Sequence, residues 1–138
     1  MSILEGAIFD YGFELKDKHN ISLFGKSIEM KITLDAYSED DGITAEQEQA
    51  YWKVKAFLAG GMAKVEKAIL EFYGKMYKEF EGGFTAEKMR KVLREECYII
   101  VKLDGETALL ISQDSAPENG LAVVILPNLE VQTQDEWL

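Results

Sequence analysis

The period of the hydrophobic residues changes twice along this chain, and that change limits the folds it can adopt. Apolar and polar residues alternate over residues 8–15 and 27–35, which predicts strands with one face on a core. From Tyr51 onward, apolar residues recur every three or four positions, as on one face of a helix. Strand-like segments return after residue 96. This order indicates an α+β fold with a mainly antiparallel sheet and helices packed on one face.

The helical stripe keeps its phase across Gly60-Gly61. Continuous phase favours one long helix, although two interior glycines, at about 1 kcal/mol each relative to alanine, make a bend or a break the alternative. The sequence "EGGF" at residues 81–84 is expected to end this helix. Thr85 is then expected to cap a second, shorter helix.

Turn signals divide the two strand regions. A short strand over residues 21–24 is expected to enter the second alternating segment through a turn at Gly25-Lys26. Asp104-Gly105 is a strong hairpin signal between "CYIIVKL" and "TALLISQ". The aliphatic run at residues 121–126 is typical of a central strand covered on both faces. No repeat, linker or low-complexity tract is found, so residues 1–138 are expected to form a single domain.

Charge is unevenly distributed along the chain, whose formal net charge is −10. No lysine or arginine follows Lys102, whereas ten of them face five glutamates between Lys53 and Arg94. The net charge repels phosphate and anionic lipid, so neither nucleic acid nor a membrane is the expected partner. The distribution fits either a highly soluble protein with mixed helix faces or an acidic surface that attracts a basic protein.

The titratable residues that often carry chemistry are few. The single Cys97 cannot form an internal disulfide and opens an apolar strand, which predicts a buried structural thiol in a reducing cytoplasm. The N-terminus lacks the basic region of a signal peptide. The only histidine, His19, lies in the polar segment "KDKHNI", which predicts a surface turn. One histidine excludes a multi-histidine metal site, and no cofactor is expected.

The stretch "DAYSEDDGITAEQEQAYW", residues 35–52, gathers six carboxylates without any lysine or arginine. A calcium loop of the EF-hand type fits poorly, because Tyr37 stands at a ligand position and Asp40 replaces the turn glycine. A helix start explains more of the pattern: Thr44 and Gln47 have the spacing of a capping box. Acidic residues in the first turn suit the helix dipole. Low-affinity metal binding remains the alternative.

The chain ends with two large apolar residues, Trp137 and Leu138. Chain ends are usually frayed unless they dock. We expect Trp137 to pack onto the domain, and an interaction edge is the alternative.

The segment "LFGKSIEMKITLDAYSEDDGITAEQEQAYWKV", residues 23–54, resembles a family of uncharacterised acidic bacterial domains. The shared features are a strand pair, an acidic turn, a Gly-Ile-Thr helix start and an aromatic-rich first helix. The resemblance implies an immunity protein of a polymorphic-toxin system. The chain departs from the family pattern at "AGG", residues 59–61, where charged helix residues are expected. No catalytic residue carries over.

The leading hypothesis is therefore a non-enzymatic protein-binding domain that neutralises a basic toxin by covering its active cleft. The carboxylates expected to bind the partner are Glu39, Asp40, Asp41, Asp114 and Glu118. One alternative is a metal-dependent enzyme with an acidic site. Another is a scaffold domain that assembles with itself through an uncovered sheet edge.

Overall fold

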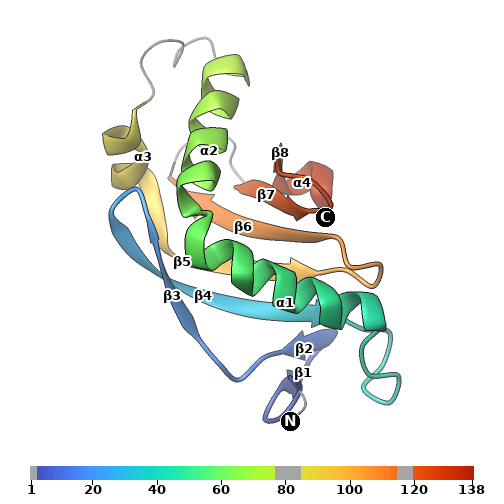
Figure 1. Cartoon of the computed structure of the whole chain (residues 1–138). Coiled ribbons are helices and arrows are strands. Elements are labelled where there is room, and N and C mark those ends of the chain that lie inside the picture. The colour runs from blue at the N-terminus through green and yellow to red at the C-terminus, as the bar shows by residue number, and fades with distance from the viewer. Residues whose placement is uncertain (1–2, 77–84, 115–119) are drawn as a thin grey trace.

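The fold is known from a computed structural model that describes residues 3–76, 85–114 and 120–138. All strands of these ranges belong to one eight-stranded sheet, and most neighbours in it are antiparallel, so the predicted α+β class is confirmed (Figure 1). The elements in chain order are β1 (Ile8–Phe9), β2 (Gly12–Glu14), β3 (His19–Leu23), β4 (Lys26–Asp35), α1 (Ala45–Gly60), α2 (Met62–Met76), α3 (Ala86–Val92), β5 (Leu93–Val101), β6 (Thr107–Gln113), β7 (Leu121–Leu126), β8 (Glu130–Thr133) and α4 (Gln134–Trp137).

The strand order is β1-β2-β4-β5-β6-β7-β8, and β3 also pairs with β4. Strands β3 and β2 share one edge of the long strand β4: β3 pairs with Lys26–Met30 and β2 with Thr33–Asp35. On its other edge β4 pairs with β5 in parallel, which the sequence did not predict. A parallel pair needs a crossover connection. The segment containing α1, α2 and α3 provides it.

The hydrophobic alternation of β4 places its apolar side chains in the same core cluster as residues of α1 and α2. These two helices lie over one face of the sheet (Figure 1). Ile28, Met30, Ile32 and Leu34 are all at most 1% exposed. The prediction that helices pack on one face is therefore confirmed for α1 and α2. The short helix α4 was not predicted. Its Trp137 packs against Ala108, Leu110, Ala122 and Val124, which alternate with the residues that face α1 and α2.

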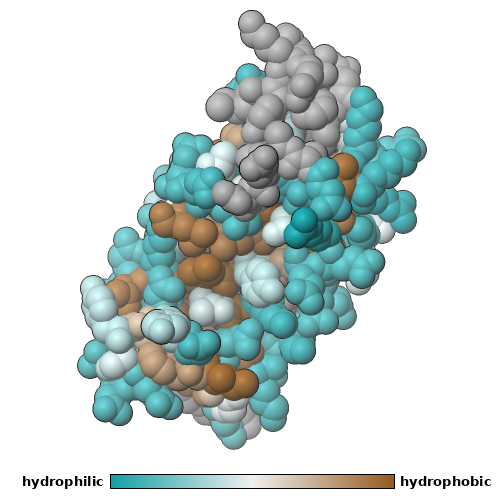
Figure 2. All heavy atoms as spheres, turned by 180° about the vertical axis from the view of Figure 1, so that it is seen from behind, coloured by the Kyte–Doolittle hydropathy of each residue, from teal (hydrophilic) through white to brown (hydrophobic). Residues whose placement is uncertain are grey.

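Figure 2 shows this second face of the molecule, with apolar residues gathered along its middle and hydrophilic residues around them. Strand β7 lies between β6 and β8 and is buried along most of its length, so the predicted covered strand is confirmed. Its two faces belong to different clusters: Val123 packs towards the helices and Val124 towards Trp137. The hairpin predicted at Asp104-Gly105 is also confirmed, because Gly105 adopts φ +91° between β5 and β6.

The prediction of one long central helix is wrong, because the helix ends at Gly60 and a new one starts at Met62. The two helices run in clearly different directions across the sheet (Figure 1). Gly61 stands at the break, where its N–H donates to the carbonyl of Phe57 at 2.6 Å. A β-carbon at Gly61 would lie 2.6 Å from that carbonyl oxygen and 2.8 Å from the Phe57 ring. The apolar stripe keeps its phase across the break and so does not reveal it. The break depends on glycine, because any β-carbon at position 61 would collide with Phe57.

We expect opposite effects of alanine at the two neighbouring glycines. Gly61→Ala should lower the free energy of unfolding by about 2 kcal/mol, the range of other overpacked sites. Gly60→Ala should raise it by about 0.5 kcal/mol, because glycine is a poor helix former and nothing lies within 4 Å of the added β-carbon. Urea unfolding of both variants measures the difference. Equal effects at the two positions would contradict this account of the break.

The turn between β3 and β4 lies at Phe24-Gly25, one residue before the predicted turn. Both residues have positive φ, 54° and 78°, as a two-residue type I′ hairpin turn requires. Phe24 tolerates this conformation because its side chain is buried and its N–H donates to Glu66 Oε2 at 3.1 Å. Strand β3 also starts earlier than expected. His19 pairs with Met30 and is half-buried, so the predicted surface turn is wrong.

The first alternating segment is also not one strand. It divides into β1 and β2, which form a hairpin with Phe9 opposite Phe13. Tyr11, which the alternation placed on the core face, instead stands in the turn with 93% of its surface exposed. The physical reason is the left-handed backbone of Tyr11, at φ 61°, which reverses the chain direction within two residues.

Candidate functional site

The acidic stretch forms the connection between β4 and α1, and its central carboxylates are exposed. Glu39, Asp40 and Asp41 all lie on the surface. Two turn contacts shape the loop: the Asp41 N–H donates to Ser38 Oγ at 3.3 Å, and the Gly42 N–H donates to the Glu39 carbonyl at 3.3 Å. These contacts involve backbone and hydroxyl groups, so the three carboxylates stay available to solvent or to a partner.

The helix-start interpretation of this stretch is confirmed. Thr44 is the N-cap of α1, and the Gln47 N–H donates to its Oγ1 at 3.1 Å. In return the Thr44 N–H donates to Gln47 Oε1 at 2.8 Å, which completes the capping box. Glu46 lies in the first turn, where the helix dipole favours negative charge. Within residues 3–76, 85–114 and 120–138, no three histidine, cysteine or acidic residues are grouped so as to hold a metal ion.

Gln47 also fixes the acidic loop to the sheet. Its side chain is fully buried, and Nε2 donates to the carbonyls of Asp35 at 2.7 Å and Val101 at 3.1 Å. Thr44 Oγ1 adds a bond to the carbonyl of Leu103 at 2.7 Å. The loop is therefore attached at its C-terminal end to the last residues of both β4 and β5. Buried hydrogen bonds of this kind hold exposed groups in a defined position.

The β5–β6 turn brings further carboxylates to the same end of the sheet. Asp104 is the residue after Leu103, whose carbonyl accepts the bond from Thr44. Glu46 and Asp104 both line a cleft of about 410 Å³. Lys53 also lines this cleft, and among its described lining residues no other is a lysine or arginine. We call the exposed carboxylates of this region the acidic end: Glu39, Asp40, Asp41, Glu46 and Asp104.

Three charged residues just inside the acidic end interact with neighbouring groups of the same chain: Asp35, Lys102 and Glu106. Burial raises the pKa of the Asp35 carboxyl, and the charge of Lys102 partly opposes that rise. Lys102 Nζ donates to the carbonyl of Trp137 at 2.6 Å and lies 4.0 Å from the centre of its indole ring. Glu106 Oε1 accepts a bond from Trp137 Nε1 at 2.5 Å. The predicted docking of Trp137 is thus confirmed, and its exposed fraction is 4%.

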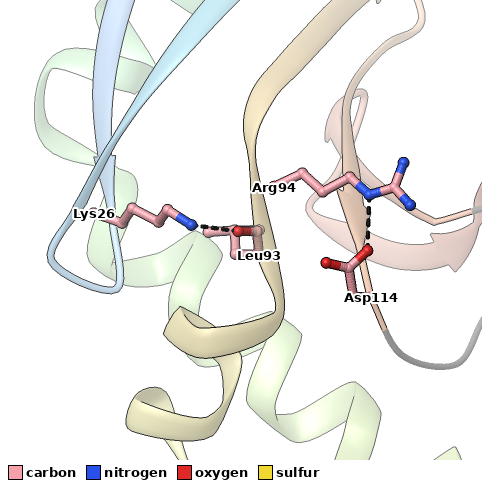
Figure 3. A network of polar contacts seen from close by, with 4 residues as sticks. All are labelled: Lys26, Leu93, Arg94 and Asp114. Atoms are coloured by element: carbon pink, nitrogen blue, oxygen red, sulfur yellow. Dashed lines mark hydrogen bonds and ion pairs between the residues drawn. The ribbon is translucent and has the colours of Figure 1, made fainter.

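Asp114 does not belong to the acidic end. Strand β6 runs antiparallel to β5, so its last residue, Gln113, lies opposite Leu93 at the start of β5. The acidic loop instead follows the end of β4, which is parallel to β5. Asp114 lies at the far end of the sheet, where its Oδ1 accepts from Arg94 Nε at 3.0 Å (Figure 3). Lys26 Nζ donates to the carbonyl of Leu93 in the same region (Figure 3).

The five carboxylates expected to bind a partner therefore do not form one surface. Glu39, Asp40 and Asp41 lie together, whereas Asp114 is distant from them and paired with a cation. Glu118 lies outside the described residues. The sequence missed Asp104 as a neighbour of the acidic loop, because only the parallel pairing of β4 and β5 brings it there. Its position in the Asp104-Gly105 turn was the one available signal.

Cys97 is 1% exposed, as expected for a structural cysteine. Burial raises the pKa of its thiol to about 12. The thiol is therefore protonated at neutral pH and is a poor nucleophile.

Two exposed aromatic residues were not anticipated at the acidic end. Tyr37 follows β4 and is 86% exposed, and Tyr11 stands in the β1–β2 turn nearby. A hydrophobic pattern cannot separate an exposed tyrosine from a buried one, because tyrosine is also common in strands that pack on a core.

No protein-family model, curated protein or solved structure matches this chain. Of the helices that the structure describes, none combines the length and apolar character that crossing a membrane requires.

Proposed function

We propose that this chain is a non-enzymatic protein-binding domain whose acidic end binds a basic protein surface. The observation that carries the proposal is the placement of Glu39, Asp40 and Asp41, which are exposed on a loop fixed by the buried Gln47. A fixed loop loses little conformational entropy on binding, so its charges contribute more to affinity than charges on a mobile loop would.

The partner proposed is the basic active cleft of a nuclease-like toxin, and the activity is neutralisation by occlusion in the cytoplasm. This choice of partner follows what is implied by the resemblance of residues 23–54 to a family of uncharacterised acidic bacterial domains, namely an immunity protein. The net charge of −10 supports it further, because a strongly acidic protein is attracted towards a basic surface from a distance. The buried, protonated Cys97 fits a reducing compartment.

Neutralising three carboxylates of the acidic end tests the proposal. In an affinity capture from lysate of the source organism, the wild-type chain should hold a basic partner at low salt and lose it at high salt. The variant Glu39→Gln/Asp40→Asn/Asp41→Asn should bind the partner at least about tenfold more weakly, since it loses three charge contacts at the interface. Titration of the captured partner by calorimetry measures the affinity.

A matched control removes the same amount of charge elsewhere. Glu87, Glu95 and Glu130 are exposed and lie in α3, β5 and β8. Their triple glutamine variant has the same net charge as the acidic-end variant and should retain most of the affinity. Equal losses in the two variants would show non-specific attraction to net charge and would refute the proposed surface. A partner that binds both variants like the wild type would also refute it.

A further inference from the structure

Two bulky residues of the described chain adopt the left-handed backbone conformation, and their surroundings differ sharply. These residues are Phe24, at φ 54°, and Tyr11, at φ 61°. Such a conformation is unfavourable for any residue with a β-carbon, and it persists only where the surroundings impose it. Phe24 is 6% exposed and its N–H is bound by Glu66, so the fold itself compensates for its backbone.

In the described part of the chain, the turn at Tyr11 is closed by a backbone bond from the Asp10 N–H to the Gly12 carbonyl at 2.9 Å, but the ring is not buried as that of Phe24 is. The Tyr11 side chain is 93% exposed, the largest value among the exposed hydrophobic residues in the part of the chain that the structure describes. Glycine or asparagine would form the same turn with less strain, because both populate this backbone region readily. The isolated domain thus gains nothing from a tyrosine at this position. A tyrosine contributes to affinity when a partner covers it, and exposed tyrosines are frequent energetic centres of protein interfaces.

Tyr37 lies at the same corner of the sheet as Tyr11. Strands β2 and β4 are antiparallel with Gly12 opposite Asp35, so the residue before Gly12 and the residues after Asp35 are neighbours in register. Figure 1 shows the β1–β2 hairpin beside the loop that joins β4 to α1. Both tyrosines therefore border the exposed carboxylates of that loop, and Asp10 adds another exposed carboxylate in the β1–β2 turn.

The charged residues closest in sequence to the two tyrosines are acidic, and Lys102, the cation whose charge acts on Asp35, is bound to the carbonyl and ring of Trp137. Residues 8–15 contain Asp10 and Glu14 but no lysine or arginine. In residues 32–52, every charged side chain is a carboxylate. The face of an aromatic ring attracts lysine and arginine side chains, and nearby carboxylates neutralise the same cations. Exposed rings bordered by carboxylates match a lysine- or arginine-rich segment better than they match an apolar or acidic one.

We propose that Tyr11 and Tyr37 are the aromatic anchors that receive lysine and arginine side chains of a basic protein segment. This inference rests on the proposed function and assigns its main contacts: the rings stack on the cations, and Asp10 and the carboxylates of the loop after β4 pair with them. The strained turn at Tyr11 presents the first ring to the partner before binding. A single cation–ring contact at an exposed site is weak, so the proposal requires both rings to contribute to affinity.

Binding of a synthetic peptide of alternating arginine and glycine tests the tyrosines separately from the carboxylates. The variant Tyr11→Gly/Tyr37→Ser should bind the labelled peptide about tenfold more weakly in fluorescence anisotropy, as expected for two lost cation–ring contacts. Tyr11→Gly alone should raise the melting temperature by about 3 °C, because glycine relieves the left-handed backbone. The double variant should melt no lower than the wild type, because Tyr37 is 86% exposed, and weaker binding by a protein of unchanged stability cannot result from damage to the fold.

The control is Tyr98→Ser, which removes an exposed tyrosine of β5 outside the acidic end. Peptide affinity should be unchanged in this variant, and a thermal melt confirms that it is folded. If the tyrosine double variant binds like the wild type while the acidic-end variant does not, the anchor proposal is overturned and the proposed function stands.

Three other results overturn the anchor proposal. One is a wild-type chain that captures a basic protein but does not bind the peptide at low salt. Another is a lower melting temperature for Tyr11→Gly, which would show that the ring stabilises the fold. The last is a wild-type dimer in light scattering that the double variant abolishes, which would make a second copy of the chain the occupant of this surface.

Discussion

Replacing Gln47 with leucine is expected to lower the free energy of unfolding by about 3 kcal/mol, because three backbone groups then lose a buried hydrogen-bond partner. The carbonyls of Asp35 and Val101 accept from Nε2, and the N–H of Thr44 donates to Oε1. The side chain is 0% exposed, so water can replace it only if the start of α1 opens. Guanidinium unfolding followed by circular dichroism measures the change.

The matched control for Gln47 is Gln49→Leu on the same helix. Gln49 is exposed, so its replacement should change stability by less than about 0.5 kcal/mol. A Gln47→Leu variant as stable as the control would mean that the amide is not what attaches α1 to β4 and β5. Because Gln47 also fixes the acidic loop, the folded fraction of this variant should bind a basic partner more weakly than the wild type.

Replacing Trp137 with alanine is expected to lower the free energy of unfolding by about 3–4 kcal/mol, the usual range for a buried tryptophan. The indole covers Ala108, Leu110, Ala122 and Val124 on the face of the sheet away from α1 and α2. Its removal also leaves Glu106 without the donor at Nε1 and Lys102 without the ring beneath its ammonium group. The loss should therefore exceed that of an ordinary side chain of α4.

Leu138→Ala is the control, because Leu138 is 67% exposed and its truncation should change stability by less than about 0.5 kcal/mol. Fluorescence gives an independent test. In a Trp52→Phe background Trp137 is the remaining tryptophan, and its emission under selective tryptophan excitation should shift to longer wavelength during unfolding, since the indole is buried in the folded chain. Emission at a solvent-exposed wavelength in the native state would contradict the docking of α4.

The features that the sequence predicted correctly depend on residues that are close to one another along the chain. Alternation placed the apolar face of β4 on the core, and the spacing of Thr44 and Gln47 predicted the start of α1. The same spacing recurs in Thr133 and Glu136, which form the capping box of α4. That helix was missed because it is only four residues long, too short for a hydrophobic period.

The features that the sequence did not predict depend on contacts between distant segments. The break at Gly61 requires the packing of Phe57 against the glycine, which a continuous apolar stripe does not reveal. The parallel pairing of β4 and β5 decided which carboxylates meet, so Asp104 joined the acidic loop and Asp114 did not. A count of charges along the chain carries no information about the direction in which strands run.

The same parallel pairing affects the order in which the chain assembles. Strands β5 to β8 follow one another and pair with their sequence neighbours, so they can form from local contacts. Strand β4 meets β5 only after the whole helical segment between Asp35 and Leu93 has been enclosed in a loop. Closing so long a loop is entropically unfavourable, and contacts of this range slow folding. We therefore expect the C-terminal strands to assemble early and the acidic end to be completed late, when β4 and β5 come together.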